Sequence, residues 1–146
     1  MFRFLRPFLS KPKQDRLAQA MERLDTSAET FRRAAEACGP PHSQLFWQLA
    51  GATADLRTRI EADPTQITPL RKLIFFFIPK MSELCTRWTG LAAMNPLTAP
   101  DPRALDDFQS YLSLIRAAEQ SCLSQQYDGL HASMAAMEQQ MARHGS

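Results

Sequence analysis

The three histidines are the first candidates for metal binding or acid–base chemistry. His42 follows a Pro-Pro turn, His131 lies in the last helical pattern, and His144 lies in the terminal tail. A zinc site on a helix usually needs paired ligands, as in HExxH, and no such pairing of histidines occurs. Cys38 precedes His42 by four residues, but Gly39-Pro40-Pro41 intervenes, which favours a helix end and a turn. We therefore predict no metal site and no cofactor.

The three cysteines are the candidate nucleophiles, and they are far apart, without a CxxC motif: Cys38, Cys85 and Cys122. An odd number at such spacing argues against a disulfide framework and is typical of a reducing compartment. Each cysteine falls on or beside an apolar stripe, where a small buried side chain is its ordinary role. We expect buried free thiols, and one intermolecular disulfide is the alternative.

Acidic pairs are the remaining candidates for acid–base catalysis. Asp106 is next to Asp107, and Glu61 is close to Asp63. Neither pair has helical spacing to a further acid that would separate their pKa values, so solvated faces are expected. The chain has only five glycines and contains no P-loop, GxGxxG or GxSxG motif. The sequence thus predicts no catalytic residues, and an enzyme is the less favoured interpretation.

Length and composition fit one globular domain. The chain has 146 residues, of which 45% are hydrophobic and 22% are charged. The net charge of +2 is too balanced to indicate nucleic acid as the main partner. The longest apolar run, from Leu73 to Ile78, is far shorter than the roughly 20 residues of a membrane span. We expect a cytoplasmic protein.

Residues 1–12 form a basic aromatic arm that precedes a single helical domain, residues 13–146. Its aromatic and basic side chains alternate: Phe2, Arg3, Phe4, Arg6 and Phe8. The cations and Pro7 interrupt any continuous apolar region, so a signal peptide is not predicted. The arm either packs on the domain or frays, or it contacts a partner or an anionic membrane surface. The membrane alternative places the protein at the inner face of the membrane.

Apolar residues that recur at steps of three, four and seven predict helices along the rest of the chain. The first helix spans about 13–38 and ends at Gly39-Pro40-Pro41. The second spans about 44–62, with Ser43 as its N-cap. The fold class is therefore all-α, an antiparallel bundle of about four helices.

A third helix carries the cleanest stripe, from Leu70 to Leu91, with Thr65 or Thr68 as its cap. Pro79 lies within it, and a proline removes one backbone donor and crowds the carbonyl one turn earlier, so we predict a kink near Phe75. We group the residues of this kink into one aromatic cluster: Phe75, Phe76, Phe77, Pro79 and Trp88. The same helix carries a row of cations, which either extend past the buried aromatics into solvent or bind an anion: Arg71, Lys72, Lys80 and Arg87.

A long helical pattern runs from Pro102, with Asp101 as its N-cap, to about Arg143. Leu123 belongs to its apolar seam, which three methionines extend: Met134, Met137 and Met141. Asp128-Gly129 is the expected break, which gives either one bent helix or two. Such a sustained heptad is typical of coiled-coil packing, within the chain or against a second copy. Core or dimer packing is favoured over an adaptable target-binding groove for the methionines.

The segment from Leu56 to the end contains a basic pair, an aromatic run ending in proline, an amphipathic helix and a terminal glycine: Arg71, Lys72, Phe75, Phe76, Phe77, Ile78, Pro79, Leu84 and Gly145. In these features it resembles the 5-bromo-4-chloroindolyl phosphate hydrolysis protein family (XpaC-like proteins). The family usually has tyrosines before the proline, where this chain has Phe76-Phe77. The resemblance implies no catalytic residues, and it implies a toxic-anion (tellurite) resistance protein as partner.

Two functions follow as hypotheses. The first is a non-catalytic helical interaction or scaffold protein, tied to toxic-anion stress and bound to a helical partner or to itself. The second is a hydrolase of phosphate esters such as 5-bromo-4-chloroindolyl phosphate, which requires Asp, His or Arg groups to converge on a cleft. The sequence favours the first.

Overall fold

The computed structural model describes residues 11–94 and 102–145. Every element in these two ranges is helical and none is a strand, which confirms the all-α class. Most of the expected arm, residues 1–10, lies outside the described residues, and so does the expected N-cap Asp101. Lys11 and Pro12 already belong to the first helix, which therefore begins two residues earlier than expected.

The first two helices are α2 (Lys11–Cys38) and α3 (Ser43–Ala62). Gly39 ends α2 with a φ of +65°, a conformation that favours glycine, and its carbonyl accepts a hydrogen bond from the Ser43 amide at 3.0 Å. The prediction of Ser43 as N-cap is wrong. His42 occupies that position because Ser43 is already the first residue of the helix, and the His42 side chain makes no capping hydrogen bond.

Residues 64–94 form one nearly continuous run of helix with four parts: η2 (Pro64–Gln66), α4 (Ile67–Lys72), the π-turn η3 (Leu73–Phe77) and α5 (Ile78–Met94). The expected caps Thr65 and Thr68 are wrong. Asp63 caps the run, because its carboxylate accepts from the Thr65 amide at 3.3 Å, the Thr65 hydroxyl at 2.6 Å and the Gln66 amide group at 2.9 Å. These hydrogen bonds hold the pKa of Asp63 below its ordinary value.

The distortion expected at Pro79 is a π-turn. The Ile78 amide bonds to the Leu73 carbonyl, five residues back rather than four. Pro79 has no amide hydrogen for the carbonyl of Phe75, and a wider turn relieves the crowding between its ring and that carbonyl. Leu73, Ile74 and Phe77 within the turn are fully buried.

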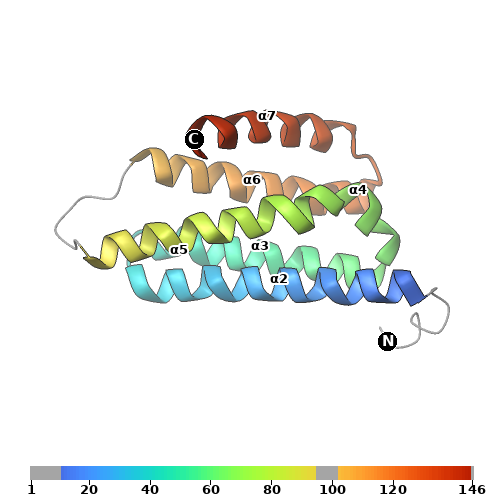
Figure 1. Ribbon diagram of the computed structural model, residues 1–146, viewed down its shortest axis with the longest axis horizontal. Helices are drawn as coiled ribbons and strands as arrows, with labels where there is room; N and C mark the ends of the chain where they lie inside the picture. The colour runs from blue at the N-terminus through green and yellow to red at the C-terminus, as the bar shows by residue number, and fades with distance from the viewer. Residues whose placement is uncertain (1–10, 95–101, 146) are drawn as a thin grey trace.

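The predicted long C-terminal helix is two helices, α6 (Pro102–Ser124) and α7 (Asp128–Gly145). The break comes slightly before Asp128-Gly129, since Gln125 has a φ of 56° and Asp128 is already in the first turn of α7. Figure 1 shows α7 running back along the molecule above α6. A single unbroken helix is therefore excluded for this conformation.

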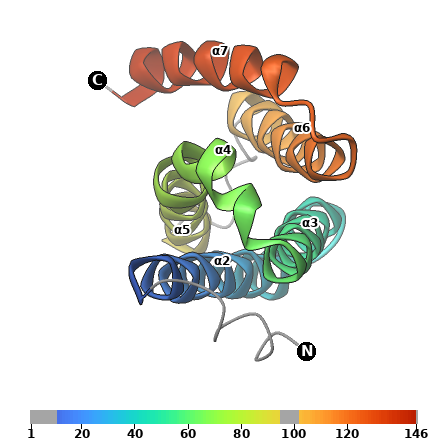
Figure 2. The same cartoon turned by 90° about the vertical axis from the view of Figure 1, so that its right-hand side faces the viewer.

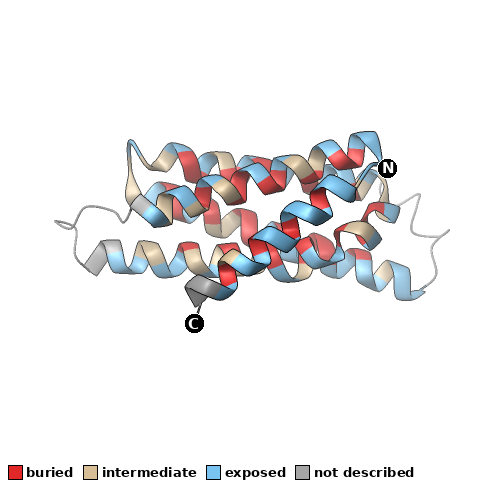
Figure 3. Ribbon diagram, turned by 90° about the horizontal axis from the view of Figure 1, so that it is seen from above, coloured by how far each residue is buried: buried red, intermediate tan, exposed pale blue. Residues whose placement is uncertain are grey.

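The helices before α7 enclose the core, and α7 covers one side of it. α2 lies on the side of the molecule opposite α7 in both Figure 1 and Figure 2. Seen from above, α7 crosses the other helices obliquely, and its outer face is exposed (Figure 3). Its inner face adds four buried residues to the core: Leu130, Met134, Met137 and Met141.

Two residues predicted to be in apolar stripes are exposed instead. The exposed fraction is 63% for Leu91 and 53% for Leu123. Leu91 lies in the last turns of α5, at the border of an open groove between α5 and α6. Leu123 lies one residue before the end of α6, and the turn at Gln125 leads α7 away from its side chain.

Candidate functional site

The oblique crossing of α7 leaves an open groove on each side of it. The first groove, which we call the α4–α7 groove, has a volume of about 510 Å³. Its walls come from α4 and η3 on one side and from α7 on the other, and its lining is mostly apolar. It is lined by Thr68, Pro69, Arg71, Lys72, Phe75, Phe76, His131, Met134, Ala135 and Glu138.

One cation at the rim of the α4–α7 groove is paired and the other is not. The Lys72 ammonium lies 2.7 Å from the Glu138 carboxylate, and both side chains are about half exposed. Such a surface pair contributes at most about 1 kcal/mol, but it neutralises the lysine locally. Among the described residues, no carboxylate lies within ion-pair distance of the exposed Arg71. The groove therefore has one uncompensated positive charge.

His131 connects the two walls of this groove. Its Nε2 lies 3.0 Å from the carbonyl oxygen of Pro69. A carbonyl only accepts, so Nε2 carries the hydrogen and Nδ1 is the acceptor of the neutral ring. The ring also stacks on Tyr127, with 6.3 Å between centroids. His131 is placed to hold α7 on α4, and its Nδ1 is the atom left for other chemistry.

The structure separates the residues that the sequence grouped around Pro79. Trp88 packs against rings of α3 and α6 instead, with its ring centroid 5.4 Å from that of Phe46 and 6.1 Å from that of Phe108. Phe77 is fully buried, and it contacts the 45% exposed Phe76 edge-on at 5.1 Å. Phe75 lies under the Arg23 guanidinium at 5.9 Å. Of the predicted cluster, only Phe75 and Phe76 line the α4–α7 groove.

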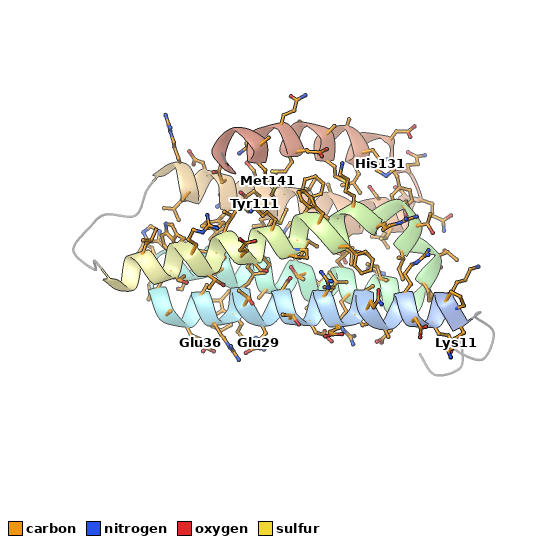
Figure 4. The ribbon with its side chains drawn as sticks, in the orientation of Figure 1. Lys11, Glu29, Glu36, Tyr111, His131 and Met141 are labelled. Atoms are coloured by element: carbon orange, nitrogen blue, oxygen red, sulfur yellow. The ribbon has the colours of Figure 1, made fainter. Side chains whose placement is uncertain are left out.

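The second groove lies on the other side of α7, between α5 and α6, and has a volume of about 410 Å³. Trp88, Leu91 and Tyr111 line it together with Met141. Figure 4 places Tyr111 and Met141 close together between α6 and α7, and His131 near the opposite end of α7. The methionine seam of α7 thus reaches both grooves, because Met134 lines the first and Met141 the second.

The other cations of the third helix have partners on the same helix. Glu83 lies 3.8 Å from Lys80 and 3.2 Å from Arg87. These pairs leave Arg71 as the one described cation in the row without a pairing carboxylate. If the row binds an anion, Arg71 is therefore the residue that would bind it.

The acidic residues predicted to lie on solvated faces mostly contact neighbouring side chains. Asp107 accepts a hydrogen bond from Gln140 at 2.6 Å, which joins α6 to α7. Glu61 pairs with Arg57 at 3.0 Å. Asp106 is exposed. Within the part of the chain that the structure describes, no three His, Cys, Asp or Glu residues are arranged to hold a metal.

The cysteines are free thiols whose burial disfavours the thiolate. Burial raises the pKa of Cys85 to about 12, and it raises the pKa of Cys38 and of Cys122 above the ordinary value. A cysteine nucleophile reacts as its thiolate, so these three thiols are weakly reactive at neutral pH. His42 follows the end of α2, and the side chain of His144 is outside the described residues.

Alkylation should distinguish the three thiols. At pH 8 we expect iodoacetamide to modify the half-buried Cys38 first and the fully buried Cys85 last, with rates differing by about tenfold or more, because both access and thiolate content differ. Peptide mass spectrometry over time measures the order. Equal rates in the native protein would contradict the burial described here, and equal rates in urea are the control.

Comparisons with protein-family models, curated proteins and solved structures find no match for this chain. Over residues 11–94 and 102–145, no helix has both the length and the hydrophobicity that crossing a membrane requires.

Proposed function

We propose that this chain is a non-catalytic helical interaction protein, an antiparallel bundle that binds a protein partner in the α4–α7 groove. The observation that carries the proposal is the 45% exposed Phe76 beside the unpaired Arg71 at one open groove. An exposed aromatic ring that borders an apolar groove, rather than standing alone on a helix face, is typical of a contact residue.

The groove favours a helical partner of particular chemistry. An amphipathic helix buries an apolar side chain in such a groove, and Phe75, Phe76 and Met134 supply apolar walls for it. A carboxylate on the partner would pair with Arg71. Methionine side chains adapt their shape, so Met134 suits a contact that forms and dissociates.

The resemblance to the XpaC-like family suggests the identity of the partner and the location. We propose a toxic-anion-resistance protein as partner, in the cytoplasm at the inner face of the membrane. The basic aromatic arm would supply the membrane contact, because phenylalanines and cations suit an anionic surface.

We expect co-sedimentation with anionic vesicles to weaken when residues 1–10 are deleted, and unchanged binding would remove the membrane contact from the proposal.

Site-specific photo-crosslinking tests the groove directly. With p-benzoylphenylalanine at position 76, we expect crosslinks to a partner protein in cells, and Arg71→Glu should reduce their yield about tenfold by reversing the charge at the rim. The matched control is the same probe at Trp47, which is similarly exposed (46%) but lies on α3. Equal yields at positions 76 and 47 would refute the groove as the contact.

A phosphate-ester hydrolase is the alternative, and one observation favours it. Arg71 and His131 line the same groove, so a guanidinium for phosphate and an imidazole for proton transfer border one space. Turnover of 5-bromo-4-chloroindolyl phosphate decides between the two functions. We expect none above a mock preparation, whereas turnover lost at least 100-fold in both Arg71→Ala and His131→Ala would establish the hydrolase.

A further inference from the structure

The turn between α6 and α7 contains a backbone conformation that its sequence does not favour. Gln125 has a φ of 56°, and it is the one non-glycine residue with positive φ in the described ranges. This region is unfavourable for a residue with a Cβ atom. Glutamine is also a strong helix former, so Gln125 and Gln126 by themselves would favour continuing α6.

A second unfavourable feature lies two residues further on. The hydroxyl oxygen of Tyr127 is buried without a partner of hydrogen-bond geometry. The Cys122 thiol lies beside it, and a thiol is only a weak hydrogen-bonding group. A buried polar atom without a good partner destabilises the conformation that contains it. The folded-back hinge therefore leaves a polar group poorly satisfied.

A third feature is the 53% exposed Leu123. Leu123 follows Leu112 by eleven residues, close to three helical turns, and precedes Leu130 by seven, close to two. In one continuous helix these three leucines would share a face. The turn at Gln125 interrupts this apolar seam, and Leu123 is left exposed.

The contacts that hold α7 on the rest of the chain do not depend on the turn. They include the Lys72–Glu138 ion pair at 2.7 Å, the Gln140–Asp107 hydrogen bond at 2.6 Å and the His131–Pro69 contact at 3.0 Å. The same contacts form equally well when α7 comes from a second copy of the chain, because every surface involved is identical. Exchange of an identical element alters only the hinge that connects it.

We propose that two copies of this chain exchange α7 and that the hinge at Gln125–Tyr127 straightens in the dimer. Each chain then has one helix from Pro102 to Gly145, about 65 Å long at 1.5 Å per residue. Gln125 returns to helical geometry, and Leu123 is covered where the two hinges meet. The inference rests on the proposed function, since it makes self-association one form of the helical interaction.

Carbodiimide coupling of Lys72 to Glu138 detects the exchange. The reagent removes water from the ammonium and carboxylate of the ion pair and joins them as an amide, without a spacer. Light and ¹⁵N-labelled chains are unfolded together and refolded, and the dimer and monomer fractions are separated. We expect coupled peptides with one light and one heavy partner in the dimer, and coupling only within one chain in the monomer.

A matched pair of hinge variants should shift the monomer–dimer equilibrium in opposite directions. Gln125→Gly accepts the positive φ and disfavours helix, so it should shift the equilibrium towards monomer. Gln125→Ala keeps the Cβ atom and favours helix, so this variant should shift the equilibrium towards dimer. We expect dimerisation constants that differ by about tenfold or more, because each dimer contains two hinges. Sedimentation gives the constants, and circular dichroism confirms that both variants fold.

Three outcomes would overturn the exchange: no dimer from wild type or Gln125→Ala, equal constants for the two variants, or dimers whose Lys72–Glu138 link always lies within one chain. These results are separate from those that test the groove. Crosslinking at position 76 to a different protein reports on the proposed function whether or not α7 exchanges.

Discussion

The missing amide hydrogen of Pro79 is the constraint on which the arrangement of the third helical run depends. Because the Phe75 carbonyl cannot receive a bond from Pro79, the chain takes a π-turn from Leu73 to Phe77. The extra residue in that turn rotates the face of the helix that meets the core. Leu73, Ile74, Phe77 and Ile78 are all fully buried as a result, while Phe76 is turned outwards. The aromatic wall of the α4–α7 groove follows from one proline.

Much of the fold could be predicted from the sequence, because prolines and apolar periodicity act locally. The ends of α2 and α3 and the distortion before Pro79 follow from residues close to them. The residues that cap α3 and the following helical run were predicted wrongly. Asp63, Thr65 and Thr68 are all good capping types within six positions, and the backbone geometry that selects Asp63 is set by the direction in which α3 ends.

The candidate groove could not be predicted, because its two walls are about 60 residues apart in the chain. Arg71 was recognisable as one cation in a row, but nothing local indicates that His131 lies against Pro69. That contact exists only because α7 folds back, and the apolar seam from α6 into α7 is equally compatible with a continuous helix. Leu123 shows the same limit, since its position in the heptad indicates burial but the turn after it exposes the side chain.

The seam of methionines differs in kind from the aromatic centre formed by Phe46, Trp88 and Phe108. Rigid rings in tilted and edge-on contact permit few replacements, whereas unbranched thioether chains follow whatever shape faces them. Met134, Met137 and Met141 therefore let the surface beneath α7 change by single substitutions without loss of fit. Over evolutionary time, the surface that α7 contacts can diverge to suit new neighbours, while the aromatic centre between α3, α5 and α6 stays fixed by its packing.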